Sequence, residues 1–184
     1  MFQPPSLSFL TGPLNPYPSS SMSPARLIQL VESNWETIAG IAIKRVHTDP
    51  EVPNYKALTD IELRSRACDL LSHLGHWLAK RDPEILARRY EDLGRQRFDE
   101  GMPLHEVIYK LQLLKRVVYE HARDQHLEVT AIELYAEQEF LGLIDEFFDR
   151  IIFRVCKGYS EQEMKHPSSS LSDRTPKHRS PVLH

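Results

Sequence analysis

The sequence predicts an all-α protein, a bundle of five helices between two flexible tails. Two observations predict the all-α class. Apolar residues recur at spacings of three and four along five segments, which is the pattern of helices with one buried face. No stretch alternates apolar and polar residues over the length of a strand, so we expect no sheet. Amphipathic helices joined by short loops pack as a bundle.

The two ends of the chain differ in composition from the middle. Residues 1–22 contain five prolines and five serines, and residues 165–184 are also rich in these two residue types. Such segments bury too little apolar surface to offset the entropy lost on ordering. We therefore expect a flexible arm over 1–22, one helical domain over 23–164 and a flexible tail over 165–184.

The first two predicted helices begin at strong start signals. Ser23 precedes Pro24, which places an N-cap before a proline at the first helical position. Thr59 and Glu62 have the spacing of a capping box. The predicted buried faces are Leu27, Val31, Trp35, Ile38, Ala42 and Val46 in the first helix, and Leu63, Ala67, Leu70, Leu74, Trp77 and Leu78 in the second.

The third and fourth predicted helices meet at a Gly-Met-Pro turn. The third follows Asp82-Pro83 and is expected to reach about Glu100, with Gly101 as its stop. Pro103 begins the fourth. The predicted buried face of the fourth helix is Leu104, Val107, Ile108, Leu111, Leu114, Val118 and Ala122.

Glycine inside a predicted helix indicates that another part of the chain packs closely against it. A glycine in mid-helix costs about 1 kcal/mol relative to alanine. We therefore expect another helix backbone to cross at Gly94, and Gly75 and Gly142 are further candidates for such a crossing.

The fifth predicted helix, from a capping box at Thr130 to about Tyr159, is apolar on most sides. Such a helix is either central in its own bundle or shared between two chains. We favour the second arrangement and predict a homodimer. Its interface is predicted to include Phe140, Ile144, Phe147, Phe148, Ile151, Ile152 and Val155.

Charge and cysteine usage exclude several classes of protein. The net charge is −3, and residues 59–164 hold 15 basic against 21 acidic residues, which argues against a nucleic-acid partner. The most apolar run, 140–156, contains five charged residues and cannot cross a bilayer. No signal peptide is recognisable, and Cys68 and Cys156 show neither metal spacing nor a disulfide framework. We expect a cytoplasmic protein with no membrane contact.

Motifs for catalysis or for a cofactor are missing. There is no Gly-x-Ser-x-Gly motif and no glycine-rich phosphate loop, so we expect no enzyme activity. His73 and His76 stand three apart, but no third ligand is apparent, and we expect neither a metal nor another cofactor. An axial haem ligand at His73, His76 or His121 is the alternative.

Arg97 raises the possibility of a binding site. Leu86, Tyr90, Leu93 and Arg97 share one face of the third helix, which places a guanidinium at the end of an apolar stripe. It could hold an anion or a carboxylate through two hydrogen bonds. The alternative is an ion pair with an acid of its own chain, Glu100 or Glu106.

Residues 73–116 contain a distinctive series of residues: Trp77-Leu78, Arg89-Tyr90, Leu93-Gly94, Arg97, and a turn from Gly101 to Leu104. This run resembles the RsbRD-type N-terminal domain of RsbT co-antagonist proteins, and the likeness extends more weakly over 24–160. The resemblance implies a dimeric, globin-like helical bundle without haem. It also implies a sensory or regulatory role in bacterial signalling and the stress response.

Only a short tail follows the fifth helix, whereas an output domain usually follows in the family. We therefore expect a stand-alone signalling domain that acts through a partner protein, or a fragment of a longer regulator. The expected ligand or partner contacts are Arg97, Tyr90 and Trp77. A globin-like protein that binds haem or another small ligand is the alternative.

Overall fold

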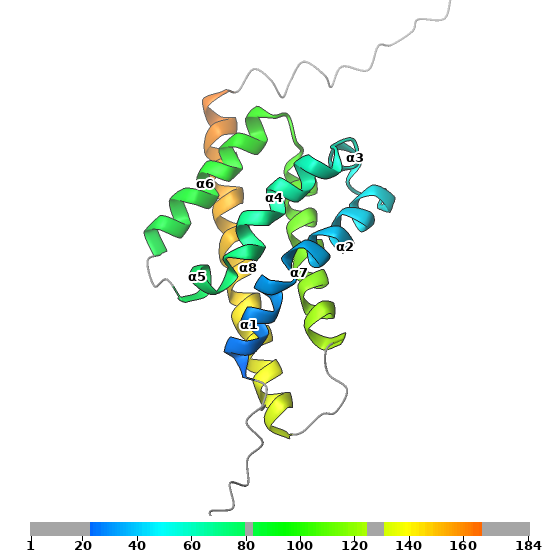
Figure 1. Cartoon of the computed structure of the whole chain (residues 1–184). Helices are drawn as coiled ribbons and strands as arrows, with labels where there is room; N and C mark the ends of the chain where they lie inside the picture. The colour runs from blue at the N-terminus through cyan, green and yellow to red at the C-terminus, as the bar shows by residue number, and fades with distance from the viewer. Residues whose placement is uncertain (1–22, 80–82, 125–130, 167–184) are drawn as a thin grey trace, which may run out of the picture.

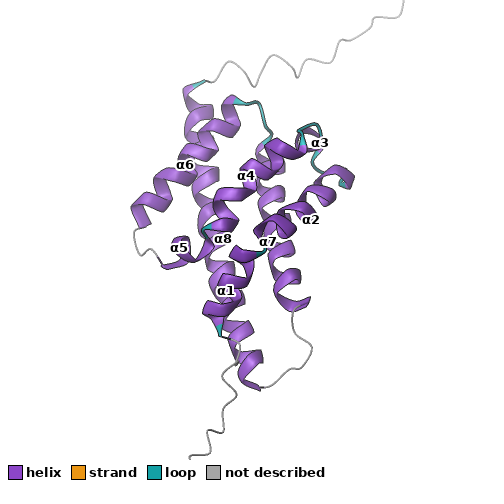
Figure 2. Cartoon of the chain, viewed as in Figure 1, coloured by secondary structure: helices purple, strands orange, loops and turns teal. Residues whose placement is uncertain are grey.

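The computed structural model describes residues 23–79, 83–124 and 131–166, and these ranges contain helices and no strand (Figures 1 and 2), which confirms the all-α class. The predicted arm over 1–22, the predicted tail over 165–184 apart from its first two residues, and the predicted caps at Asp82 and Thr130 lie outside the described residues. Lys165, predicted to belong to the tail, is the last residue of the final helix. The helices are α1 (Pro24–Ser33), α2 (Trp35–Thr48), α3 (Pro53–Lys56), α4 (Asp60–Ser72), α5 (Leu74–Ala79), α6 (Pro83–Asp99), α7 (Leu104–Asp124) and α8 (Ala131–Lys165).

The described ranges hold eight helices where five were predicted, because two predicted helices are interrupted and α3 is additional. Asn34 separates α1 from α2, and its side chain donates to the carbonyl of Leu30 at 2.9 Å. His73 separates α4 from α5, directly after Ser72 donates to the carbonyl of Cys68 at 2.6 Å. Side chains that bond the preceding turn compete with helix continuation, and apolar periodicity does not register such a break.

The predicted helix-start signals at the described positions are confirmed. The Ser23 hydroxyl accepts from the amide of Arg26 at 3.4 Å. The Thr59 hydroxyl accepts from the amide of Glu62 at 3.4 Å, and the Glu62 carboxylate accepts from the amide of Thr59 at 2.8 Å. At the end of α6, Gly101 has φ of 71°, the left-handed conformation that ends many helices.

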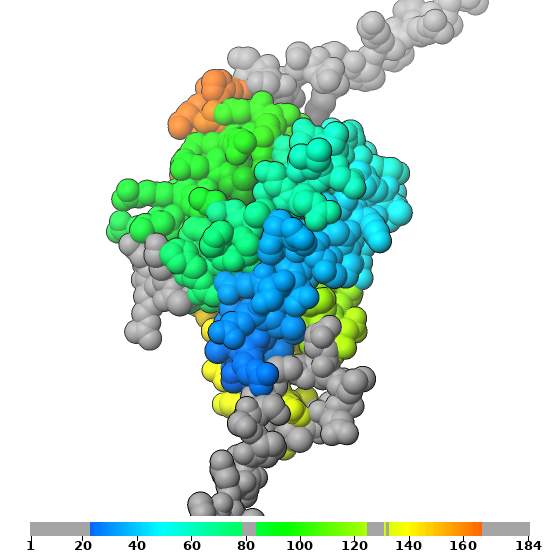
Figure 3. Space-filling model, in the orientation of Figure 1, coloured from blue at the N-terminus to red at the C-terminus, as the bar shows by residue number. Residues whose placement is uncertain are grey.

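Helix α8 is the centre of the bundle. It packs against α1, α6 and α7, most extensively against α6. On the face shown in Figure 3, the helices from α1 to α6 cover most of α8, and only its two ends are visible. The wide apolar surface of α8 is therefore explained by burial within one chain.

The backbones of α6 and α8 come into direct contact at two glycines. A Cβ atom on Gly94 would lie 2.1 Å from the carbonyl oxygen of Val155, and one on Gly158 would lie 1.9 Å from that of Glu91. No side chain fits at such distances. The predicted crossing at Gly94 is confirmed, and Gly158 is its unpredicted counterpart on α8.

The other two glycines proposed as crossing points behave differently. A Cβ on Gly75 would lie 3.1 Å from side-chain atoms of Ile28 and Glu32 on α1, and the amide of Gly75 donates to Glu32 at 2.7 Å. Gly75 therefore fixes α5 against α1. A Cβ on Gly142 would meet no atom within 4 Å, so the prediction of a crossing there is wrong.

Glu106, at the start of α7, is a buried acid that organises the short helix α3. Its side chain is 1% exposed. The carboxylate accepts from the backbone amide and the side-chain amide of Asn54, at 2.9 and 2.5 Å, and from the amide of Tyr55 at 3.4 Å. An acid at these first amides of α3 satisfies donors that the helix itself leaves unpaired. It thereby fixes Tyr55 in place.

Candidate functional site

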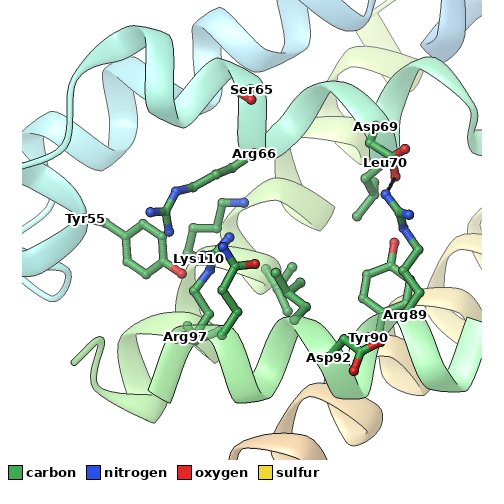
Figure 4. A pocket seen from close by; sticks show the side chains of 14 residues that line it. Tyr55, Ser65, Arg66, Asp69, Leu70, Arg89, Tyr90, Asp92, Arg97 and Lys110 are labelled. Carbon is green, nitrogen blue, oxygen red and sulfur yellow. Dashed lines mark ion pairs between the residues drawn. The ribbon is translucent and has the colours of Figure 1, made fainter. Parts of the chain in front are cut away.

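A cavity of about 670 Å³ lies between α4 and α6, with α3 and α7 as its remaining walls. Its volume is within the usual range for small-molecule sites. Figure 4 shows charged side chains at both ends and aliphatic side chains between them. The lining residues are Tyr55, Ser65, Arg66, Asp69, Leu70, Arg89, Tyr90, Asp92, Leu93, Gln96, Arg97, Val107, Lys110 and Leu111.

Three cationic side chains converge beside Tyr55 at one end of the cavity. They are Arg66 from α4, Arg97 from α6 and Lys110 from α7, and together we call them the cationic cluster (Figure 4). The Arg66 guanidinium carbon lies 5.9 Å from the centre of the Tyr55 ring. Three helices thus bring three positive charges to one place, which costs electrostatic free energy unless negative charge compensates it.

A single carboxylate, that of Glu100, compensates two of these charges. Arg97 Nη1 donates to both oxygens of Glu100 at 2.7 Å, and Arg66 Nη1 lies 3.1 Å from Glu100 Oε2. The Arg97 side chain is only 8% exposed. Arg66 Nη1 is buried, and its contact with Glu100 is an ion pair without hydrogen-bond geometry. Of the two predicted internal partners of Arg97, Glu100 is the one found, and Glu106 serves α3.

Lys110 has neither a hydrogen bond nor an ion pair with any residue in the described ranges. It lines the cavity and is half-buried. Burial, together with the nearby charges of Arg97 and Arg66, lowers the pKa of Lys110 from 10.5 to about 8. At neutral pH the ammonium is still the main form, held among like charges without a counterion.

The opposite end of the cavity is balanced in charge. Arg89 Nη2 lies 2.5 Å from Asp69 Oδ2, and the Arg89 guanidinium lies 5.1 Å from the Trp77 ring centre. Trp77 Nε1 donates to the carbonyl of Asp69 at 3.2 Å. Burial raises the pKa of Tyr90, which keeps its phenol protonated. Ion pairs and donors at this end can position the polar part of a ligand.

Two of the three contact residues expected from the sequence line this cavity, and the third contacts one of its lining residues. Arg97 and Tyr90 line it at opposite ends, and Trp77 stands behind Arg89. Sequence reasoning missed Arg66 and Lys110. Each of them nevertheless occupies a core-facing position by helical spacing, and for Lys110 the apolar neighbours are Val107 and Leu114. A charged residue at a core-facing position of a helix is also the feature by which the sequence identified Arg97.

The residues expected at a dimer interface lie within the protomer. Phe140, Ile144, Phe147, Phe148, Ile151 and Val155 are at most 4% exposed, and Ile152 is half-buried. The helices around α8 already cover these side chains, so the first six belong to the core and offer no surface to a second copy. The large apolar side chains that α8 does expose are Leu134, Tyr135, Phe153 and Met164.

The candidate histidines do not contribute to the cavity. His73 and His76 are exposed on other surfaces, and none of the lining residues is a histidine. Nε2 of His121 is buried and has no hydrogen-bond partner among the described residues. Within those residues, no three His, Cys, Asp or Glu side chains gather as a metal site would require.

Comparison with protein families gives one match. Residues 46–166 match the model of the RsbT co-antagonist protein rsbRD N-terminal domain. The chain belongs to this family. The comparisons with curated proteins and with solved structures found no significant match.

Membership of the RsbRD N-terminal family confirms the resemblance inferred from residues 73–116, and it makes the chain a regulatory domain of stress signalling. Every residue that lines the cavity falls inside the matched range. Helix α1 lies before that range, yet its Leu27 and Val31 are fully buried in the core. None of the helices in the described ranges has the length and apolar character needed to cross a membrane.

Proposed function

We propose that this RsbRD-type domain works as a cytoplasmic homodimer that regulates a partner protein of bacterial stress signalling, without catalysis of its own. Family membership over residues 46–166 carries the proposal. Two free cysteines, Cys68 and Cys156, support a reducing compartment. Ser65 lines the cavity without a histidine among the lining residues to act as its base, which supports a binding role for the cavity.

Exposed apolar side chains on α8 support the dimer. Leu134, Tyr135 and Phe153 are 56%, 71% and 61% exposed. Large apolar side chains on one helix of a regulatory domain are typical of a surface that meets another protein. The proposed interface is therefore this outward face of α8, in place of the buried residues expected from the sequence.

Light scattering coupled to gel filtration tests the dimer. At micromolar concentration, the full chain should show twice its mass of 21.4 kDa. The double variant Tyr135→Ser/Phe153→Ser should shift the equilibrium to the monomer. Ile61→Ser removes an even more exposed apolar side chain, from α4, and serves as the control, with no shift expected. A monomeric mass for the unmodified chain at these concentrations would refute the dimer.

We further propose that α8 transmits the signal. Helix α6 forms a wall of the cavity and contacts the backbone of α8 at Gly94 and Gly158, so displacement of α6 requires α8 to move or the contact to open. Hydrogen exchange of the α8 amides, measured on the chain alone and with a partner protein purified from the host, tests this. Equal protection of α8 in both samples would contradict the proposal.

A further inference from the structure

The cationic cluster holds more positive charge than the described residues compensate. Arg66, Arg97 and protonated Lys110 contribute three positive charges, and Glu100 contributes one negative charge. Two positive charges remain in surplus at a place that is partly buried. Buried charges in proteins are normally paired, so the surplus indicates that a ligand supplies the missing negative charge.

The donors of the cluster suit a tetrahedral oxyanion. Arg66 Nη1 is buried and makes no hydrogen bond, although it forms an ion pair with Glu100, and Lys110 lines the cavity without a hydrogen bond or ion pair among the described residues. Guanidinium groups hold phosphate through pairs of hydrogen bonds, and an ammonium group contributes a compact point charge. A phosphate monoester carries about −1.5 to −2 charge at pH 7, which matches the surplus, whereas a carboxylate compensates only half of it.

The rest of the cavity has the volume and the apolar surface to hold an organic group in addition to a phosphate. Leu70, Leu93, Val107 and Leu111 give the cavity an aliphatic surface. Figure 4 shows aliphatic side chains between the cationic cluster and the balanced end. We call this aliphatic surface the apolar wall. The share of liquid volume per water molecule is about 30 Å³, so a cavity of about 670 Å³ accommodates a phosphate together with an organic group of many atoms.

We propose that the cavity between α4 and α6 binds a phosphate monoester of a small organic group, with the phosphate at the cationic cluster and the organic group against the apolar wall. Donors and acceptors at the far end, in the Arg89–Asp69 pair and the Tyr90 hydroxyl, select the polar substituents of that group. In the proposed regulatory function this ligand is the signal; that meaning rests on the proposed function, while the binding itself does not.

Calorimetric titration of the full chain tests the binding with defined probes. At pH 7 and low salt, phenyl phosphate should bind with a dissociation constant below about 1 mM. Benzoate and inorganic phosphate should each bind at least about tenfold more weakly, because benzoate lacks one charge and inorganic phosphate lacks the organic group. No heat of binding from phenyl phosphate at about 10 mM would overturn the proposal. Inorganic phosphate that binds as tightly as phenyl phosphate would overturn the organic part of it.

Matched variants on α7 locate the site. Lys110→Met keeps the length of the side chain but removes the charge, and it should weaken phenyl phosphate binding by at least about tenfold. Lys115→Met makes the same change on α7 at a lysine that pairs with Asp145 at 3.0 Å, outside the cavity, and should leave binding unchanged within about twofold. Circular dichroism of each variant verifies its fold. Equal weakening by both variants would overturn the assignment.

The pH profile gives a second, independent readout. The groups that face Lys110 are Arg66 from α4, Arg97 with its partner Glu100 from α6, and Tyr55 from α3. The ester gains its second charge above about pH 6, and Lys110 loses its proton above about pH 8. Affinity should therefore be greatest between these values and fall above pH 8 in the unmodified chain but not in Lys110→Met. The same fall in both proteins would contradict the role of Lys110.

The two proposals fail separately. A monomer that binds phenyl phosphate refutes the dimer and leaves the site intact. A dimer that binds none of the probes refutes the site and leaves the dimer intact.

Discussion

Replacing Lys110 by methionine is expected to stabilise the protein although it removes a binding group. Lys110 holds an uncompensated ammonium beside Arg66 and Arg97, and burial with these like charges lowers its pKa from 10.5 to about 8. Methionine has a similar length, no charge, and good packing in irregular spaces. The substitution removes the cost of the charge and retains most of the packing.

The magnitude follows from the pKa. One pKa unit corresponds to about 1.4 kcal/mol, so a decrease from 10.5 to about 8 corresponds to roughly 3 kcal/mol at neutral pH. Lys110 is half-buried and faces a cavity that admits water, which screens part of this cost. We expect the free energy of unfolding to rise by about 1 to 3 kcal/mol and Tm to rise by roughly 3 to 10 °C.

The sign of the pH dependence is fixed by linkage. Below about pH 8, Lys110 is protonated in both the folded and the unfolded chain, and the full cost is present. Between pH 8 and 10.5 the unfolded chain binds the additional proton, so the stability of the unmodified protein rises with pH relative to the variant. The advantage of Lys110→Met should therefore be constant from pH 6 to 8. It should shrink above pH 8 by up to about 1.4 kcal/mol per pH unit.

Urea unfolding followed by circular dichroism, at pH values from 6 to 9.5 and without added anions, measures both effects. Lys115→Met is the matched control; loss of its partly exposed ion pair with Asp145 should lower stability by less than about 1 kcal/mol. A Lys110→Met variant that is less stable than the unmodified chain at pH 7 would refute the reasoning. So would a stability difference that does not change between pH 8 and 9.5.

Two further predictions concern the packing that shapes the cavity. Gly158→Ala places a Cβ 1.9 Å from the carbonyl oxygen of Glu91, so α6 and α8 must separate. We expect the free energy of unfolding, measured with urea, to fall by more than about 2 kcal/mol. Gly142→Ala, at an open position of α8, should be neutral or stabilising by up to about 1 kcal/mol. Equal stability of these two variants would contradict the crossing. Glu106→Ala leaves the amides of Asn54 and Tyr55 without their acceptor. We expect the free energy of unfolding to fall by about 2 to 4 kcal/mol and hydrogen exchange at the start of α3 to become faster. Unchanged exchange there would count against the anchoring role of Glu106.

The physical basis of the sequence predictions also marks their limit. Apolar periodicity identified the helical segments, and short-range signals identified the starts at Ser23 and Thr59 and the stop at Gly101, because each depends on neighbouring residues alone. The breaks at Asn34 and His73 were missed, because a side-chain hydrogen bond to the preceding turn leaves the apolar pattern unchanged.

The α8 surface shows the same limit at the level of packing. Its apolar width indicated that it must be covered on several sides. Whether helices of the same chain or a second chain would cover it depends on how α1, α6 and α7 are arranged, and that information is not local. The structure covers it with the chain's own helices, which places Phe140 and Phe148 in the core.

The sequence by itself determined the all-α class, the family, most helix boundaries and the presence of a cation, Arg97, at the end of an apolar stripe. Only the tertiary structure decided that Arg66 and Lys110 join it from two other helices, that Glu100 is the carboxylate among the described residues that compensates the group, and that a cavity opens beside them. The reason is physical. Helical periodicity reports which side of one helix is buried, whereas the meeting of charges from α4, α6 and α7 is set by the angles and depths at which those helices pack.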